Sequence, residues 1–319
     1  MNNSFGDSFR ISLFGESHTP SLGVVIEGVH QSFDISQLDF ETDLSRRRSG
    51  RPGTTPRIEA DEPLVEDLRS QNGTIRITFE NTNTRSSDYS QFEAVPRPGH
   101  ADFTSRVKYG HTFPGGGIFS GRMTLPIVAA GVLAKKLIEP QKVEASLVEI
   151  GGIGAEDSAV VENALKKAAR EGDSLGGVVE CRCTNVPAGL GEPFFDSVES
   201  LISHAMFSIP GIRGIEFGEG FEASRSTGFA HNDAFIDEAG HTLTNHAGGV
   251  NGGITNGNPL IFRVAVKPTS SIRRAQTTFD FASGRMTTLE AGGRHDVCFA
   301  LRVPPVVEAL TAIVLANLR

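Results

Sequence analysis

Two kinds of hydrophobic spacing occur in this 319-residue chain, and their order along it most strongly constrains the fold. Apolar residues alternate with polar ones at positions 9–13, 75–79, 179–183 and 262–266, which predicts half-buried β-strands. Helical spacing occurs at 125–134, 157–171, 198–205 and 306–314. These segments do not follow the strict βαβα order of a doubly wound parallel sheet. We therefore predict an α+β fold with antiparallel sheets, organised as a single domain over residues 1–319.

The charge and cysteine content restrict the possible partners and compartments. With 30 Lys and Arg against 38 Asp and Glu, the formal net charge is −8, whereas general nucleic-acid binding requires a basic surface, so we expect no nucleic-acid partner. The sequence contains neither a signal-peptide pattern nor an uncharged apolar run of about 20 residues, so we expect no membrane association. Cys181, Cys183 and Cys298 have no CxxC spacing. We expect neither disulfides nor a metal site, and a cytoplasmic location.

Glycine is unusually abundant, at 36 of 319 residues or about 11%, against a usual share of about 7%. Glycine permits positive φ and lets the backbone approach a ligand closely. Loops rich in glycine or proline occur at 45–57, 97–102, 114–117, 245–259 and 267–271. Such loops on a rigid scaffold commonly carry function, although ordinary surface turns are the alternative interpretation.

The most cationic segment lies between positions 46 and 57, where five arginines occur without an acidic residue: Arg46, Arg47, Arg48, Arg51 and Arg57. Guanidinium groups bind phosphate and carboxylate oxygens two at a time, so the segment is a candidate site for a multiply charged anion. A solvated charge run is the alternative. Arg97, Arg122 and Arg294 lie in other glycine- or proline-rich motifs and are candidates for the same ligand.

Short nucleotide-binding patterns give a weaker indication. The KPTSS segment at 267–271 follows a predicted strand and offers a lysine, hydroxyls and peptide N–H groups for a phosphate. It is not a P-loop, because the chain has no Gly-Lys dipeptide. A GxGxxA match at Gly218, Gly220 and Ala223 lacks a surrounding βαβ unit, so we exclude a dinucleotide-binding fold.

Three side chains are candidates for proton transfer. His18 stands in GESH after the first predicted strand, and His100 ends RPGH. Imidazole exchanges protons near neutral pH, although most single histidines are structural or lie on the surface. Asp296, in GRHD, precedes the last predicted helix, and an ion-paired turn residue is its alternative interpretation.

The order of these motifs resembles the chorismate synthase family. The resemblance rests on GESH, RRR at 46–48, RSSDYS at 85–90, RPGHADFT at 97–104, the glycine triplet at 115–117, AAGVLAKKLI, EGDSLGG, VPAGLGEP, NHAGGVNGGITNG, KPTSSI and GRHDVC. The motifs extend from about residue 6 to residue 319. The resemblance implies a sandwich with helices between antiparallel sheets, and a homotetramer.

The resemblance also implies a reaction and a cofactor. The reaction is the 1,4-elimination of phosphate from 5-enolpyruvylshikimate 3-phosphate to give chorismate, in aromatic amino acid biosynthesis. The family requires reduced FMN without net redox change, because electron density lent by the flavin assists departure of a poor leaving group. Some relatives reduce FMN with NADPH and others rely on an external source, so both possibilities stay open.

Residue roles follow from the matching motifs. His18 is expected to protonate the departing phosphate, His100 to stabilise or protonate the reduced flavin near N1, and Asp296 to relay the proton taken up through N5. The implied substrate-binding set comprises Glu16 and Ser17 of GESH, Arg46, Arg47, Arg48, Arg97, Ser120, Arg122 and Arg294. The implied flavin-binding set comprises Ser120, Ile209, Pro210, Gly252, Lys267, Pro268, Thr269, Ser270, Ser271 and Arg294. Arg47 and Arg51 would contact NADP if it is used.

Several positions depart from the family pattern. Ile118 and Phe119 stand where many relatives have an arginine and a serine, and Thr19 replaces a small residue after GESH. Only the backbone of Ile118 and Phe119 is therefore expected to contact flavin, and Arg51 matches a family arginine only approximately. These departures motivate an alternative hypothesis, a non-catalytic flavin- or anion-binding paralogue.

Overall fold

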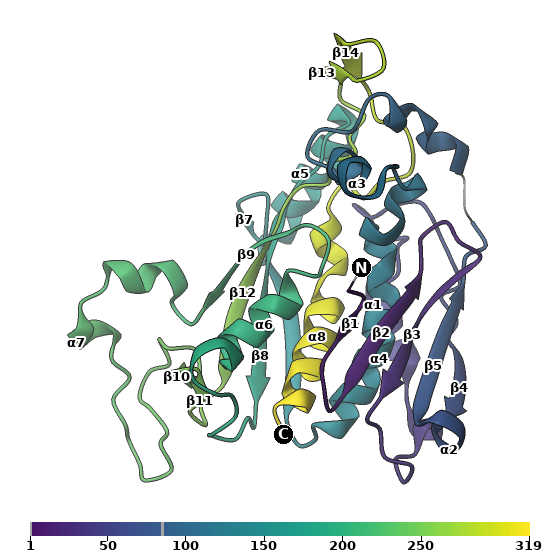
Figure 1. Cartoon of the computed structure of the whole chain (residues 1–319). Helices are drawn as coiled ribbons and strands as arrows, with labels where there is room; N and C mark the ends of the chain where they lie inside the picture. Colours follow the sequence, from purple (N-terminus) through teal and green to yellow (C-terminus); the bar gives the residue numbers. More distant parts are fainter. Residues whose placement is uncertain (1, 84–85) are drawn as a thin grey trace.

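Two antiparallel sheets form the outer layers of the molecule (Figure 1). The computed structural model describes residues 2–83 and 86–319. In the first sheet the order is β1 (Ser4–Phe5), β2 (Arg10–Gly15), β3 (Ser21–Glu27), β5 (Thr74–Glu80) and β4 (Leu64–Leu68). The order in the second is β7 (Ile153–Gly154), β6 (Lys142–Ile150), β8 (Gly177–Thr184), β12 (Leu260–Val266) and β9 (Ile212–Phe217). All four alternating segments are strands, so this part of the prediction is confirmed.

Two long apolar helices fill the space between the sheets. α4 (Thr124–Leu137) contacts β3 and β5 of the first sheet, and α8 (Pro304–Asn317) contacts β6 and β8 of the second. The helices cross at Gly131, where an added Cβ would lie 2.2 Å from the Ala309 Cβ. Because both helices face apolar partners on several sides, their sequences are apolar almost throughout. The α+β sandwich with internal helices is confirmed.

Further elements surround these layers. The remaining α-helices are α1 (Phe40–Arg47), α2 (Arg69–Asn72), α3 (Asp102–Tyr109), α5 (Ser158–Glu171), α6 (Val198–Met206) and α7 (Gly228–His231). Two further strand pairs are β10 (Val250–Asn251) with β11 (Ile254–Thr255), and β13 (Gln276–Asp280) with β14 (Arg285–Leu289). The helices predicted at 157–171 and 198–205 correspond to α5 and α6. One hydrophobic cluster joins residues of both sheets and the helices between them.

The functional loops converge on one end of the sandwich. The segment before α4, the end of α1, the segment after β12 and the turn between α6 and β9 all contribute to one cavity. Gly218 and Gly220 lie in the turn after edge strand β9 and lead into a 3-10 helix, in agreement with the exclusion of a dinucleotide-binding fold. Within the described ranges, no helix is long and apolar enough to cross a membrane.

Candidate active site

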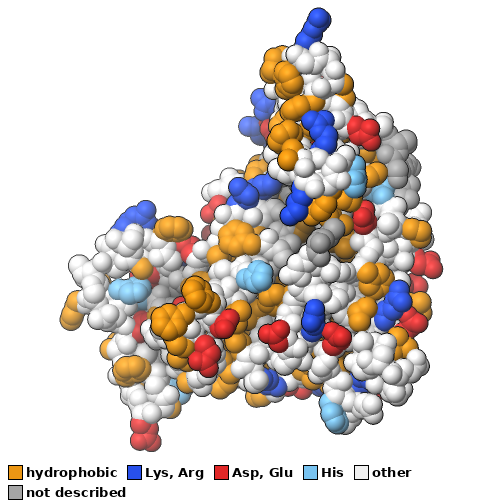
Figure 2. Space-filling model, in the orientation of Figure 1, with side chains coloured by type: hydrophobic (Ala, Val, Ile, Leu, Met, Phe, Trp, Pro, Cys, Tyr) orange, Lys and Arg blue, Asp and Glu red, His pale blue; other side chains and the backbone are white. Residues whose placement is uncertain are grey.

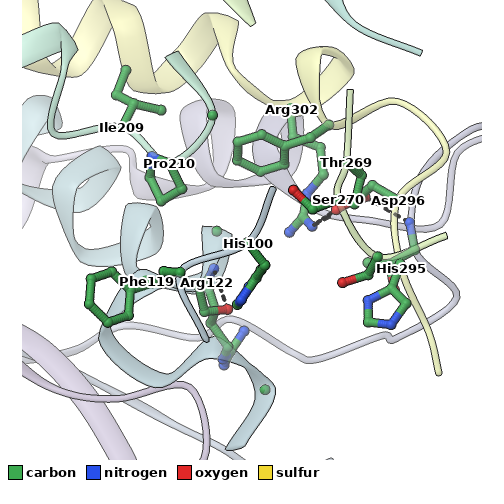
Figure 3. A pocket seen from close by; sticks show the side chains of 18 of the residues that line it. His100, Phe119, Arg122, Ile209, Pro210, Thr269, Ser270, His295, Asp296 and Arg302 are labelled. Atoms are coloured by element: carbon green, nitrogen blue, oxygen red, sulfur yellow. Dashed lines mark hydrogen bonds and ion pairs between the residues drawn. The ribbon is translucent and has the colours of Figure 1, made fainter. Parts of the chain in front are cut away.

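A cavity of about 590 Å³ lies where these loops meet (Figure 3). This volume is typical of sites that bind small molecules. Most residues predicted for ligand binding line it, although they come from segments far apart in the sequence. They are Arg47, Arg97, His100, Ser120, Arg122, Ile209, Pro210, Lys267, Pro268, Thr269, Ser270, Ser271, Arg294 and Asp296.

The cavity is cationic within an acidic protein. Among the described lining residues, eight cationic side chains stand against three carboxylates. The cations are Arg47, Arg57, Arg97, Arg122, Arg213, Lys267, Arg294 and Arg302, and the acids are Glu59, Asp61 and Asp296. Because the walls exclude much of the water, this excess creates a strong attraction for a small polyanion.

Asp61 holds two of the arginines in fixed positions. Its Oδ2 accepts a hydrogen bond from Arg47 Nη1 at 3.2 Å, and its Oδ1 accepts one from Arg122 Nη1 at 2.8 Å. Asp61 is 5% exposed and has φ of 53°, an uncommon value for a residue other than glycine. The backbone strain and the buried ion pairs indicate that Asp61 orients the cationic wall, a role that no sequence motif indicated.

Two buried polar atoms in the cavity wall lack a partner among the described residues: Arg47 Nη2 and Thr269 Oγ1. Arg47 is only 1% exposed, and burial together with nearby Arg302 lowers its pKa to about 9. Buried donors of this kind are costly unless a ligand or water completes their hydrogen bonds. The cavity therefore has unfilled capacity for anionic oxygen atoms.

The glycine triplet allows two histidines to approach the cavity. Gly115, Gly116 and Gly117 have φ of 60°, 81° and 48°. A Cβ on Gly115 would lie 1.8 Å from the His18 ring, and one on Gly116 would lie 3.5 Å from His100 Nε2. Any side chain at Gly115 would displace His18. The absence of side chains in the triplet thus leaves room for both imidazoles, of which His100 lines the cavity.

His18 is not among the residues that line the cavity, but its ring lies beside two of them, Gly115 and Tyr89. Its Nδ1 is 3.0 Å from Ser17 Oγ, and its ring packs edge-on against Tyr89, with 5.2 Å between the centroids. Tyr89 and Gly115 line the cavity, whereas Ser17 is fully buried. Thr19 stabilises the GESH turn, because its Oγ1 bonds both the N–H and the carbonyl of Glu16. Thr19 is therefore compatible with the motif.

His100 is oriented by Asp102 at the start of α3. His100 Nδ1 lies 2.7 Å from Asp102 Oδ1, and Arg97 forms two hydrogen bonds of 2.7 Å to the same carboxylate. Burial lowers the pKa of His100, so its ring is neutral at pH 7. For Asp102, burial favours a higher pKa, but hydrogen bonds from Arg97 and His100 outweigh it and hold the pKa well below its usual range. Nδ1 therefore carries the proton, and Nε2 faces the glycine triplet.

The segment after β12 provides a polar edge beside apolar walls. Lys267 Nζ contacts Ser270 Oγ and the Gly99 carbonyl, at 2.5 and 3.1 Å. Ser271 Oγ accepts a hydrogen bond from Arg97. Burial lowers the pKa of Lys267, and nearby Arg213 acts in the same direction. The apolar walls come from Ile118, Phe119, Phe207, Ile209, Pro210 and Phe299.

Asp296 lies at the opposite side of the labelled group from Ile209 and Pro210 (Figure 3). One carboxylate oxygen accepts a hydrogen bond from the Thr55 N–H at 2.8 Å, and the other lies 3.3 Å from Arg302 Nη1. Arg294, two residues earlier, bonds Asn83. Arg302 and Thr55 were not singled out from the sequence, because neither stands in a recognisable motif.

Other predicted residues lie outside the lining described for this cavity. Arg46 forms an ion pair with buried Glu308 at 2.6 Å, and Arg48 pairs with Glu41 at 2.5 Å. Arg51 donates to the carbonyls of Arg46 and Leu301. Gly252 occupies the β10–β11 turn, with φ of 62° and no neighbour within 4 Å of an added Cβ. Glu16 packs behind the triplet, with its Oε2 2.9 Å from where a Gly117 Cβ would be.

Together, the sandwich and its cavity define an enzyme that binds a small, multiply charged anion beside groups able to exchange protons. The family model for chorismate synthase matches residues 9–319. The chorismate synthase of Chitinophaga pinensis is 53% identical over 99% of this chain and 96% of the relative. That of Dehalococcoides mccartyi is 44% identical over 100% of this chain and 96% of the relative. A crystal structure of chorismate synthase is 25% identical, with a TM-score of 0.72, over 98% of this chain and 92% of that one.

The chain belongs to the chorismate synthase family. Its activity is that of the family, a lyase reaction of the shikimate pathway that converts 5-enolpyruvylshikimate 3-phosphate to chorismate. The family requires a reduced flavin. This identification favours the enzyme over a non-catalytic paralogue, and the substrate is a small molecule that matches the anionic preference of the cavity.

Proposed function

We propose that the cavity holds reduced FMN against the KPTSS segment and the substrate against the arginines. Three observations support a fit to both molecules. Thr269 Oγ1 and Arg47 Nη2 are buried donors with no partner among the described residues, and apolar side chains oppose the polar edge. The excess of cations suits the substrate, which carries a phosphate and two carboxylates. The observation that carries the proposal is the convergence of these groups on one cavity.

When bound, reduced FMN supplies electron density that assists cleavage of the allylic carbon–oxygen bond. In our proposal Lys267, Thr269, Ser270 and Ser271 hold the cofactor, while Ile209 and Pro210 pack against it. Ile118 and Phe119 add apolar lining and exclude water. In this low-dielectric setting, each charge interaction with the substrate is strengthened.

The cationic wall stabilises the leaving phosphate. Arg47 and Arg122 are held by Asp61 before any ligand binds, so no reorganisation is needed when charge accumulates on the departing oxygens. Arg97 and Arg294 complete the wall, together with Ser120 at the end of the triplet. We propose that His18 donates a proton to the departing phosphate oxygen, because its ring lies beside Gly115, which lines the cavity.

His100 and Asp296 have separate proton-handling roles in this proposal. His100 donates its Nδ1 proton in a hydrogen bond to Asp102 and directs Nε2 toward the cavity. A bound anion there would raise the pKa of His100 and favour imidazolium. Asp296 would accept the proton removed from the substrate on its carboxylate. Contacts with the Thr55 N–H and Arg302 orient that carboxylate.

The test is anaerobic assay of the purified chain with substrate and chemically reduced FMN. We expect release of phosphate and formation of chorismate, and a loss of roughly 100-fold or more in His18→Asn, His100→Asn and Asp296→Asn. His30→Asn is the matched control, because His30 is exposed and, among the described residues, its side chain bonds Ser32 shortly after β3. A wild-type rate in His18→Asn would refute its assignment.

Two further features of the expected function are tested separately. NADPH oxidation in the presence of oxidised FMN will show whether the chain reduces its own flavin. Of the two residues expected to contact NADP, Arg47 lines the cavity and Arg51 bonds carbonyls beside it.

We also propose a homotetramer in the cytoplasm. Exposed phenylalanines such as Phe195 and Phe229 support assembly, which light scattering will measure, and three free cysteines suit a reducing compartment.

A further inference from the structure

A projecting arm, residues 218–247, leaves the second sheet after β9 and returns at β10 (Figure 1). Apart from a short 3-10 helix (Gly220–Arg225) and α7, the described arm has almost no regular structure. Its large apolar side chains are exposed, with Phe229 98% and Phe235 76% exposed, and Figure 2 shows hydrophobic side chains on its surface. Within a single chain, apolar burial therefore contributes little to the arm's conformation, and polar contacts hold it there.

One polar cluster joins three separate parts of this arm. Glu219 comes from its outgoing base, His231 from the end of α7 and His246 from its returning base. His231 Nδ1 lies 2.9 Å from Glu219 Oε2, and His246 Nε2 lies 3.5 Å from Glu219 Oε1. One nitrogen or oxygen from each residue falls within 4.8 Å of the other two. A cavity of about 390 Å³ adjoins Glu219 and His246.

Hydrogen bonding determines which nitrogen of His246 is available. Its Nδ1 lies 3.1 Å from the His231 carbonyl, which can only accept, so Nδ1 carries a proton. In the neutral ring, Nε2 then presents a lone pair to the Glu219 carboxylate, and two acceptors face each other at 3.5 Å. A positive charge between them, either a second proton or a cation, removes this repulsion.

We propose that Glu219, His231 and His246 bind one Zn²⁺ ion that ties the base of the arm together. Two imidazoles and a carboxylate are ligands that zinc prefers, and a water would complete the tetrahedron. Zinc bonds of about 2.1 Å place ligand atoms about 3.4 Å apart, a value between the two contacts of Glu219. The histidine side chains, 32% and 27% exposed, have room to rotate toward the ion.

The surroundings of His246 also resemble those of a metal ligand. Asp233 lies 3.5 Å from Nδ1 of His246. It also fixes the returning chain by accepting hydrogen bonds from the backbone N–H groups of His246 and Ala247. Carboxylates or carbonyls behind a ligating imidazole orient the ring and increase its basicity. None of these residues lines the cationic cavity, so the zinc would be structural and independent of the lyase chemistry.

The test is Zn²⁺ titration of the untagged, EDTA-treated, full-length chain by calorimetry at neutral pH. We expect one saturable site per chain, visible absorption bands when Co²⁺ replaces Zn²⁺, and a Zn²⁺-dependent rise in Tm. His246→Gln and Glu219→Gln should each weaken binding at least tenfold. Zn²⁺ should also slow proteolysis within residues 218–247 of the wild type but not of these two variants.

The matched control is His241→Gln, because His241 pairs with Asp237 at 2.6 Å on the same arm but outside the cluster. It should bind Zn²⁺ as the wild type does. Failure of the wild type to bind would overturn the proposal and leave protonation as the source of the positive charge. Equal binding by wild type and by both cluster variants would also overturn it, since the metal would then lie elsewhere. Circular dichroism will verify that each variant is folded.

Discussion

Asp61 illustrates how a single residue outside any motif can organise the cationic cavity. It adopts a left-handed backbone conformation in order to place one carboxylate between two arginines. Either arginine alone would be a buried or nearly buried charge, and Arg47 also faces Arg302. The arrangement resembles the strained, charge-dense settings found at functional sites, where the surrounding structure compensates the local cost.

Replacing Asp61 by Asn should separate charge from backbone conformation, because Asn also tolerates positive φ. Loss of both buried ion pairs should lower the free energy of unfolding by roughly 3 kcal/mol, since Arg47 remains buried without its counter-charge. We also expect an increase of about tenfold in KM for the phosphate substrate. Misaligned arginines should weaken substrate binding by about 1.4 kcal/mol, which corresponds to a factor of ten. Urea unfolding and steady-state kinetics will measure these effects.

The matched control is Asp67→Asn, which removes a bidentate partner of Arg69 at the edge of the first sheet. The Asp67 side chain is 39% exposed, so we expect a loss of about 1 kcal/mol or less and no change in KM. An unchanged KM in the Asp61 variant would show that the arginines keep their alignment without it.

His295 should make stability depend on pH. Burial lowers its pKa from 6.5 to about 4 in the folded chain. As pH falls from 6.5 to 4, the unfolded chain takes up a proton that the folded chain does not bind, so folding loses stability and the loss levels off below pH 4. At about 1.4 kcal/mol per pKa unit, and allowing for partial exposure of the ring, the loss is roughly 2 kcal/mol.

His295→Asn should therefore reduce the slope of unfolding free energy against pH within this window, as measured by urea unfolding at a series of pH values. His111→Asn, which changes an exposed histidine outside the described cavity lining, should leave the slope unchanged. Identical profiles for wild type and His295→Asn would contradict the linkage.

At the scale of elements, the crossing of α4 and α8 fixes the distance between the two sheets. The crossing has almost no space at Gly131, whose missing side chain admits the backbone of α8 at Ala309. The N-terminus of α4 follows directly after Arg122 and the glycine triplet, so the position of this helix determines where the cationic wall lies. Helix packing and site geometry are thus coupled.

Gly131→Ala should destabilise the protein although alanine favours helices by about 1 kcal/mol. The added Cβ would lie 2.2 Å from the Ala309 Cβ, and overpacking of this kind costs roughly 1–3 kcal/mol. We expect a lower Tm and reduced activity, since α4 must shift. The double variant with Ala309→Gly should recover part of the loss; strictly additive effects in this double-mutant cycle would contradict direct contact.

The whole molecule shows which features sequence patterns can predict. Strand alternation and helical spacing are local, so the main layers follow from them. What each arginine contacts is not local. Successive helical positions differ by about 100°, so the adjacent Arg46, Arg47 and Arg48 point in different directions, but the fold decides that they reach Glu308, the cavity wall and Glu41 respectively. The partners Asp61 and Glu308 stand in no motif. A single domain over 1–319 stays a prediction, which the shared core supports.

The final prediction concerns the charge asymmetry of the whole molecule. A chain with net charge −8 repels anions except at the cationic cavity, so attraction of substrate should depend on ionic strength. Raising it from about 0.1 M to about 1 M shortens the screening length from about 10 Å to about 3 Å, and kcat/KM should fall roughly three- to tenfold. Arg213→Gln, at an exposed position of the lining, should weaken this dependence, whereas Arg225→Gln, paired with Glu222 outside the cavity, should preserve it. If all three proteins respond equally to salt, the local field of the cavity does not guide binding, and the arginines act only after contact.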